Sequence, residues 1–187
     1  MRDLFHGTLV RLTSEPPEVL AKADVAWDRD TELHRLGDSD PVRLWSETRR
    51  KRAREKQFVE NGLQDDYFYF SIRALAGDEL IGHTMLRVKW AQADAIMGIG
   101  IGKRDYWGRG YGRDALDLIL GYGFNELDLR RVTLSVGGHN ARAIRLYERA
   151  GFQHEGHIRQ VERREGRRWD EIWMGILREE WAHAQKG

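Results

Sequence analysis

The sequence predicts a mixed α/β fold in a single domain of 187 residues. Segments that alternate in polarity, as strands do, are interspersed with segments whose apolar residues recur at the three and four residue spacing of amphipathic helices. A strand, loop, helix, strand, helix unit occupies residues 97–151 at the centre of the chain. A chain of this length buries one good core and needs no second domain.

The first half of the chain is expected to hold three strands and two helices around one acidic loop. Paired prolines suit the start of a helix, glycine suits its end, and Gly-Asp between two β-rich runs indicates a hairpin turn. The expected elements are a strand at 8–12, a helix from Pro16 to about Trp27, an acidic loop at 28–40, a helix from Pro41 to Gly62, and strands at 67–74 and 79–90 joined at Gly77-Asp78.

The second half is expected to alternate strands and helices up to a C-terminal hairpin. Apolar residues at helical spacing mark the face of the first of these helices that packs on the core: Leu116, Ile119, Leu120, Phe124 and Leu127. The expected elements are a strand at 97–102, a helix at 113–127, a strand at 131–136, a helix at 140–150 closed by Gly151, and strands at 157–165 and 169–177 around Gly166.

Residues 107–112, WGRGYG, connect the strand at 97–102 with the helix that follows. Gly108, Gly110 and Gly112 can take backbone angles closed to other residues, and without side chains they let N–H groups converge on an anion. The start of the next helix adds free N–H groups and the positive end of its dipole. The sequence therefore predicts that this glycine loop binds a phosphorylated ligand.

The two commonest phosphate-binding motifs do not fit this loop. A P-loop needs Lys-Ser or Lys-Thr after its glycines, and neither is present. A dinucleotide fingerprint that starts at Gly108 needs its third glycine at position 113, which is Arg113, and an acidic residue after the next strand, where the chain reads Gly137-Gly138-His139. Chemistry with NAD or simple ATP chemistry is therefore disfavoured.

The glycine loop resembles motif A of the GCN5-related N-acetyltransferases (GNATs), in which such a loop holds the pyrophosphate of coenzyme A. Residues 140–152, NARAIRLYERAGF, are similar to that family's NxxAIxLYxxxGF segment. The resemblance is strong over residues 97–181 and covers the N-terminal half in outline. Residues after 152 resemble the branch that includes ribosomal-protein alanine and spermidine/spermine N-acetyltransferases.

The resemblance implies a GNAT fold: a central, mostly antiparallel twisted sheet, splayed at the cofactor cleft and flanked by helices on both faces. Residues 1–187 would form one domain, with an acceptor-side half (1–95), an acetyl-CoA-binding core (96–152) and a C-terminal β-hairpin and tail (153–187). Acetyl-CoA would lie between the strand ending at Gly102 and the strand 131–136, where a β-bulge breaks the pairing.

The resemblance also implies which residues contact acetyl-CoA. The N–H of Ile101 would polarise the thioester carbonyl as an oxyanion-hole donor does, which makes Ile101 a catalytic residue. Pantetheine amides would pair along the strand edge, and the pyrophosphate would bind N–H groups of the loop. The expected cofactor-binding residues are Ile99, Gly100, Ile101, Trp107, Gly108, Arg109, Gly110, Tyr111, Gly112, Arg113, Asn140 and Tyr147.

Acetyl transfer to an amine requires an acid, because the leaving thiolate must be protonated. Tyr147 is the candidate. It follows Asn140 by seven residues and so shares nearly the same helix face. The spacing alone favours a core aromatic residue, and the resemblance reverses this preference in favour of the catalytic role.

A base is also required, because an amine is mostly ammonium at neutral pH. Many relatives place a glutamate on the central strand, where this chain has Ile96 and Met97. Deprotonation is then left to water, Asp94, His139 or a residue of the acidic loop.

The acceptor is expected to be a primary amine that attacks acetyl-CoA directly in a ternary complex. Five carboxylates in residues 28–40, against two arginines, favour a polyamine or another cationic small molecule, unless they are merely solvated. Acetylation of a protein or peptide amine is the alternative. A non-catalytic acetyl-CoA-binding module is the alternative from a different functional class.

Composition limits the other partners. The formal net charge of +1 gives no electrostatic reason to expect nucleic acid, and the basic run at 49–56 reads as a solvated helix face balanced by glutamates rather than an RNA-binding helix. The absence of cysteine and of any long apolar run predicts a cytoplasmic protein without disulfides or membrane contact.

A histidine cluster and several tryptophans have ordinary structural explanations. His154, Glu155 and His157 cluster at a strand start without another clear ligand, so no metal is assigned. Several tryptophans are expected in the core or at the interface of a homodimer or higher homo-oligomer: Trp90, Trp169, Trp173 and Trp181.

Overall fold

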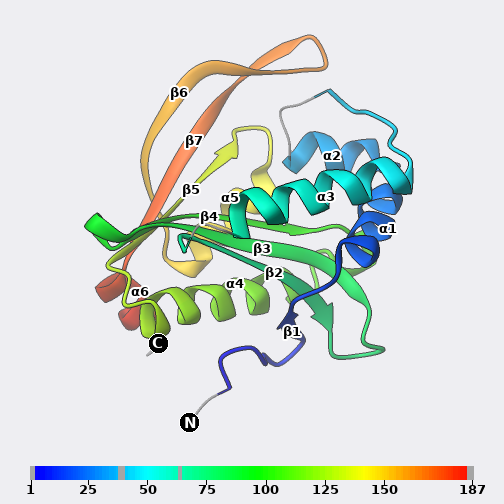
Figure 1. Ribbon diagram of the computed structural model, residues 1–187. Coiled ribbons are helices and arrows are strands. Elements are labelled where there is room, and N and C mark those ends of the chain that lie inside the picture. The colour runs from blue at the N-terminus through cyan, green and yellow to red at the C-terminus, as the bar shows by residue number, and fades with distance from the viewer. Residues whose placement is uncertain (1–2, 38–40, 63–64, 185–187) are drawn as a thin grey trace.

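The computed structural model describes residues 3–37, 41–62 and 65–184. Seven strands form one sheet: β1 (Val10–Thr13), β2 (Tyr67–Ala74), β3 (Leu80–Lys89), β4 (Asp94–Ile101), β5 (Arg131–Gly137), β6 (Gln153–Arg164) and β7 (Arg167–Leu177). Their order is β1-β2-β3-β4-β5-β7-β6, and each neighbouring pair is antiparallel except β4 with β5. The mostly antiparallel sheet expected from the sequence is confirmed (Figure 1).

Helices cover both faces of the sheet, as expected (Figure 1). One face carries α1 (Pro17–Asp28), α2 (Thr31–Gly37) and α3 (Glu47–Gly62), and the other carries α4 (Tyr111–Gly121), α5 (Ala141–Ala150) and α6 (Arg178–Ala184). Shorter turns are Trp90–Gln92, Arg104–Tyr106 and a π-helical extension of α4 at Tyr122–Glu126. None of the described helices combines the length and hydrophobicity needed to cross a membrane.

The acidic segment expected as a loop at 28–40 is largely helical, because α2 occupies residues 31–37. Asp30 begins this helix: its Oδ1 accepts hydrogen bonds from the backbone N–H groups of Glu32 and Leu33, both at 3.1 Å. Such a cap satisfies donors that have no partner in the first helical turn. Asp38 and Asp40 lie outside the described residues.

The helix expected to begin at Pro41 begins at Glu47 instead. Ser46 is its start signal. The Ser46 side chain accepts from the backbone N–H of Arg49 at 3.3 Å, and its carbonyl accepts the first helical bond from Arg50 at 2.9 Å. A serine cap defines the first helical turn more strongly than the proline five residues earlier.

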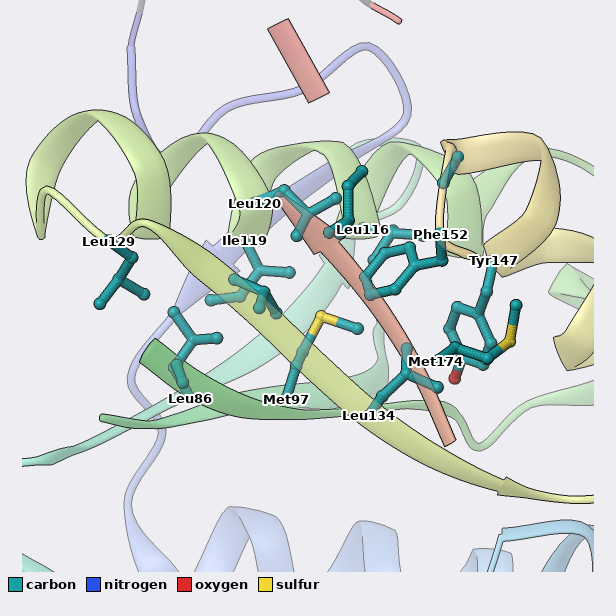
Figure 2. Close-up of a cluster of buried hydrophobic side chains, with 14 of the residues drawn as sticks. Leu86, Met97, Leu116, Ile119, Leu120, Leu129, Leu134, Tyr147, Phe152 and Met174 are labelled. Carbon is teal, nitrogen blue, oxygen red and sulfur yellow. The ribbon is translucent and has the colours of Figure 1, made fainter. Parts of the chain in front are cut away.

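The main core lies between the sheet and α4 (Figure 2). Leu116, Ile119 and Leu120 of α4 and Phe124 just after it are completely buried, so the apolar helix face expected from the sequence is confirmed. These side chains pack against strand residues that include Leu86, Met97 and Leu134. Trp181 joins the same core beside Phe124, with ring centroids 5.2 Å apart, whereas Trp90 is half exposed and is not a core residue.

The sheet splays between β4 and β5. These strands pair only where Asp94–Ile96 lie beside Arg131–Thr133, and then they separate. The expected bulge is wrong, because the register of β4 with β3 runs without a shift from Asp94 to Ile101. Instead, β5 stays paired with β7 from Arg131 to Gly137, and so it follows β7 away from β4.

The splay leaves part of the β4 edge without a strand partner. The N–H of Gly102 donates to the carbonyl of Ile81 at 2.7 Å on β3. Backbone groups of an antiparallel strand face its partner at every second residue. The N–H and C=O groups of Ile99 and Ile101 therefore point away from β3, into the gap between β4 and β5.

Candidate active site

A cavity of about 580 Å³ opens where β4 and β5 separate. It reaches both faces of the sheet. On the core side its lining includes Met97, Ile99, Ile101, Val136, Ala143 and Tyr147, and on the opposite side it includes glycines of β4, Ser135 and residues of α1, α2 and α3. Two molecules that approach from opposite faces can therefore meet between the diverging strands.

Glycines of β4 make room for aromatic rings on the helix side of the cavity. A Cβ on Gly102 would lie 2.2 Å from the indole of Trp27, and one on Gly100 would lie 3.7 Å from the ring of His83. Only a glycine at position 102 allows Trp27 to lie against the strand. The ring of His83 lies between Trp27 and Tyr69, with centroid distances of 6.5 and 5.7 Å.

This aromatic wall is uncharged at neutral pH. Burial, reinforced by the positive charge of Arg54, lowers the pKa of His83 to about 4. Burial also raises the pKa of Tyr69, so its hydroxyl stays protonated. Buried polar atoms on all three rings have no hydrogen-bond partner among the described residues: Trp27 Nε1, Tyr69 Oη and His83 Nδ1.

Two arginines of α3 point into the cavity rather than into solvent. Arg54 forms a two-pronged ion pair with Asp24, with both bonds at 2.7 Å, and Arg50 binds Asp28 at 2.5 Å. The expectation that residues 49–56 form a solvated face is therefore wrong for these two residues. Their i, i+4 spacing was the available signal, because it places both on one side of the helix.

The far end of the cavity, beyond β5, is lined by His139 and by two glutamates of the β6–β7 hairpin, Glu162 and Glu171. The His139 Nε2 lies 2.9 Å from the carbonyl oxygen of Arg35, and its Nδ1 lies 3.4 Å from Glu162 Oε2. A Cβ on Gly137 would lie 2.5 Å from both side chains, so glycine is required there. Sequence reasoning missed Glu162 and Glu171.

Tyr147 belongs to the core (Figure 2). It also lines the cavity. Its ring packs against Phe152, with centroids 5.7 Å apart, and the residue is 7% exposed. Burial raises the pKa of Tyr147 to about 12. The hydroxyl therefore carries its proton throughout the neutral range, as an acid that protonates a leaving group must.

Asn140 ties two elements together at the cavity wall. Its Oδ1 accepts from the N–H of Ala143 at 3.1 Å and caps α5, while its Nδ2 donates to the carbonyl of Leu36 at 3.0 Å. Both polar ends of this side chain are therefore engaged within the protein, and they join α5 to the end of α2.

The glycine loop turns sharply into α4. Gly108 and Gly110 have φ of +69° and +90°, in the left-handed region that favours glycine. The first helical bond of α4 runs from the N–H of Asp114 to the carbonyl of Gly110 at 2.9 Å. The backbone N–H groups of residues 111–113 precede that bond and have no partner inside the helix.

Asp114 fixes the position of this helix start. Its carboxylate accepts backbone N–H bonds from Thr8, Leu9 and Val10 at 2.8 to 3.0 Å. Burial alone would raise the pKa of Asp114, but these donors hold it below its usual range. The glycine loop is thereby anchored to the start of β1.

Residues 11–153 match the Acetyltransferase (GNAT) domain family. The chain belongs to the GNAT acetyltransferase family. The matched region includes β4, the glycine loop, α4, β5 and α5, which together form the splay and its surroundings.

Individual relatives agree with this assignment. The uncharacterized N-acetyltransferase p20 of Bacillus licheniformis is 32% identical over 114 residues, 60% of this chain and 64% of that protein. The uncharacterized N-acetyltransferase YnaD of Bacillus subtilis is 29% identical over 126 residues, 67% of this chain and 74% of that protein. Spermidine N-acetyltransferase from Vibrio cholerae, solved with CoA and spermine, has the same fold: the TM-score is 0.76 at 21% identity, covering 92% and 96% of the two chains.

The site residues expected from the sequence fall into two groups in this GNAT domain. Ile99, Gly100, Ile101, Asn140 and Tyr147 line the cavity. The glycine-loop residues lie outside its lining, and they adjoin it where the indole N–H of Trp107 donates to the carbonyl of Ile101 at 2.7 Å. They are Trp107, Gly108, Arg109, Gly110, Tyr111, Gly112 and Arg113.

Three of the loop side chains are engaged within the domain. The ring of Tyr111 is buried against Tyr106, with centroids 4.7 Å apart. Arg113 binds Asp117 at 2.9 Å, and Arg109 donates to the carbonyl of Asp105 at 2.9 Å. Their backbone N–H groups, rather than these side chains, are what the loop offers to an anion.

The structure separates the candidates for the base. Asp94 is at the opposite end of β4 from Ile101, faces Arg130 at 3.6 Å and does not line the cavity. Asp28 pairs with Arg50, and Asp30 and Glu32 pair with Arg104. Hydrogen bonding to Arg104 is the main reason that the pKa of Asp30 falls to about 2.

Each described carboxylate of the acidic segment is therefore held by an arginine. Four described carboxylates line the cavity, and Asp24 and Asp28 are paired with arginines. Glu162 and Glu171 form no ion pair with an arginine or lysine among the described residues. Among those residues, no group of three or more His, Asp or Glu side chains is arranged to hold a metal ion.

Proposed function

We propose that this GNAT domain transfers the acetyl group of acetyl-CoA to a primary amine, by direct attack in a ternary complex. The observation that carries the proposal is the cavity at the β4–β5 splay, which reaches both faces of the sheet. A cofactor that enters beside α4 and α5 and an amine that enters beside α1 to α3 can meet there without a covalent enzyme intermediate.

The cofactor side of the proposal rests on unpaired backbone donors. The N–H groups at the start of α4 and the left-handed glycines before it suit the pyrophosphate of coenzyme A. The N–H of Ile101 points into the gap, where it can polarise the thioester carbonyl. The carbonyl of Ile101 is already bonded to Trp107, so pantetheine amides would pair with Ile99 instead.

Tyr147 is the proposed acid. It lines the cavity on the cofactor side, and its pKa of about 12 keeps the proton available at neutral pH. The thiolate of coenzyme A would take this proton as the carbon–sulfur bond breaks. No other tyrosine lines the core side of the cavity within the described residues.

A small amine is the proposed acceptor. The acceptor side is roofed by the end of α2, which His139 and Asn140 hold through the carbonyls of Arg35 and Leu36. A cavity covered on this side by α2 suits a small molecule better than a protein N-terminus. A polyamine or another cationic amine is supported by the spermidine acetyltransferase with this fold and by the glutamates at the end of β5.

The test is amine-dependent release of free thiol from acetyl-CoA, measured with a panel that contains aliphatic monoamines, polyamines and peptides with free N-termini. The proposal expects release with one or more small amines and little with peptides. Tight acetyl-CoA binding without any acceptor-dependent release would show a non-catalytic binding module instead. Release with peptides alone would overturn the small-molecule acceptor.

A further inference from the structure

The pair formed by His139 and Glu162 has an unusual arrangement of hydrogen-bonding atoms. A carbonyl oxygen only accepts, so the His139 Nε2 that lies 2.9 Å from the Arg35 carbonyl must carry a hydrogen. In the neutral ring, Nδ1 then bears a lone pair. That lone pair faces Oε2 of Glu162 at 3.4 Å, and an ionised carboxylate is also only an acceptor.

Both facing atoms are buried and have no hydrogen-bond partner among the described residues. Two buried acceptors opposite each other repel, and each lacks the hydrogen bond it had in water. One added proton between Nδ1 and Oε2 removes the repulsion and gives both atoms a partner. The pair is therefore built to receive a proton.

The location of the pair matches what the reaction needs. Both side chains line the cavity at the end of β5, on the acceptor side of the splay. They occupy the space that a Cβ on Gly137 would fill, so they lie directly on the strand that forms one wall of the gap. The pair and Ile101 line the same cavity, so an amine bound there lies between the proposed base and the proposed thioester donor.

We propose that the His139–Glu162 pair takes the proton from the acceptor ammonium and so serves as the general base. This inference rests on the proposed function. The ammonium loses one proton to the pair, and the freed nitrogen lone pair forms a bond to the thioester carbon. The carbon–sulfur bond breaks with its electrons on sulfur, and Tyr147 protonates the thiolate. The second nitrogen proton restores the Tyr147 hydroxyl, and the pair returns its proton to solvent.

Several other titratable and charged groups surround the His139–Glu162 pair. On α2 these are His34 and the guanidinium of Arg35, which binds Glu165 at 2.9 Å. On β6, Arg164 donates to the carbonyl of Arg35 at 3.2 Å. On β7, Glu171 lines the same cavity and its Oε2 accepts from Trp173 at 3.2 Å.

The decisive variant is Glu162→Gln, because an amide N–H can donate to Nδ1 and leaves no acceptor pair. The expected result is a fall of about 100-fold or more in kcat with an aliphatic primary amine at pH 7, with the KM for acetyl-CoA unchanged. The matched control is Glu155→Gln, which removes a carboxylate of the same strand, β6, that pairs with Arg131 and does not line the cavity. Its kcat should stay within about twofold of wild type.

A second measurement separates a missing base from a damaged site. The same amine and a trifluoromethyl analogue, whose lower pKa leaves most of it uncharged at pH 7, are compared as acceptors. Glu162→Gln should lose most of its rate with the first amine and keep a near wild-type rate with the second. Equal losses with both amines, or no loss with either, would overturn the base assignment. Wild-type protein that releases no thiol with any amine would instead overturn the proposed function.

Discussion

The indole N–H of Trp107 donates a hydrogen bond of 2.7 Å to the carbonyl oxygen of Ile101. This bond joins the glycine loop to the end of β4, and Arg142 of α5 lies 3.5 Å over the indole ring. The single indole therefore links the loop, the central strand and the helix that carries Tyr147. It fixes the distance between the expected pyrophosphate donors and the expected thioester donor.

Trp107→Phe keeps an aromatic ring but removes the donor. A hydrogen bond of this kind contributes about 0.5–1.5 kcal/mol, so the KM for acetyl-CoA should rise roughly two- to tenfold while kcat changes little. Steady-state thiol release with varied acetyl-CoA measures this. An unchanged KM would show that the loop does not depend on this bond for its position.

Gly110 and Gly112 offer a matched comparison within the glycine loop. At Gly110 an alanine would be forced to φ near +90° and would press on Leu9 at 3.1 Å, whereas an alanine at Gly112 would make ordinary contacts with Leu146 and Ile101 at 3.6 and 3.7 Å. Gly110→Ala should therefore raise the KM for acetyl-CoA severely, Gly112→Ala should change it little, and Gly112→Leu should again raise it. If the loop is the cofactor site, titration of acetyl-CoA binding should rank the dissociation constants of the three variants in the same order as their KM values. Equal affinities in all three variants would contradict that assignment.

Tyr147→Phe tests the proposed acid. Loss of the hydroxyl should lower kcat by about 100-fold or more and leave the KM for acetyl-CoA unchanged. Because the pKa of Tyr147 is about 12, wild-type kcat should show no loss from tyrosine ionisation up to about pH 10. Normal turnover in the variant would leave Tyr147 as a core residue only.

His83 should make the stability of the domain depend on pH. Its folded-state pKa of about 4 lies below the ordinary value of 6.5, so the unfolded chain takes up the proton first as the pH falls. The neutral histidine therefore costs nothing above pH 6.5, and stability is lost progressively between pH 6.5 and 4, by on the order of 2–3 kcal/mol. Denaturant melts of wild type and His83→Phe at pH 7 and pH 4.5 measure this. A wild type that loses no more stability than the variant would contradict a folded state that keeps His83 neutral.

Local signals in the sequence were enough for the parts of the fold that short segments determine. The α4 core face, α5 with its closing glycine, and the Gly77-Asp78 turn all follow from residue spacing and from glycine at positive φ. The starts of α2 and α3 were missed because Asp30 and Ser46, the capping residues, were read as parts of a loop and a helix.

The site could be predicted only where neighbouring residues in sequence form it. Tyr147 and Ile101 both lie within residues 97–181, the part of the sequence that resembles the family strongly, and both line the cavity. Glu162 reaches the end of β5 only because β6 pairs with β7 and β7 pairs with β5, a register that no local pattern encodes. Arg54 and Asp24 meet because α1 and α3 pack together, although they are thirty residues apart in sequence.

The central claim is that an amine attacks acetyl-CoA directly while both are bound at the splay. Initial rates of thiol release, measured while acetyl-CoA and the best small amine are varied together, test it most directly. The account predicts double-reciprocal lines that intersect, as a ternary complex requires. Parallel lines, or thiol release that does not depend on the amine, would contradict it.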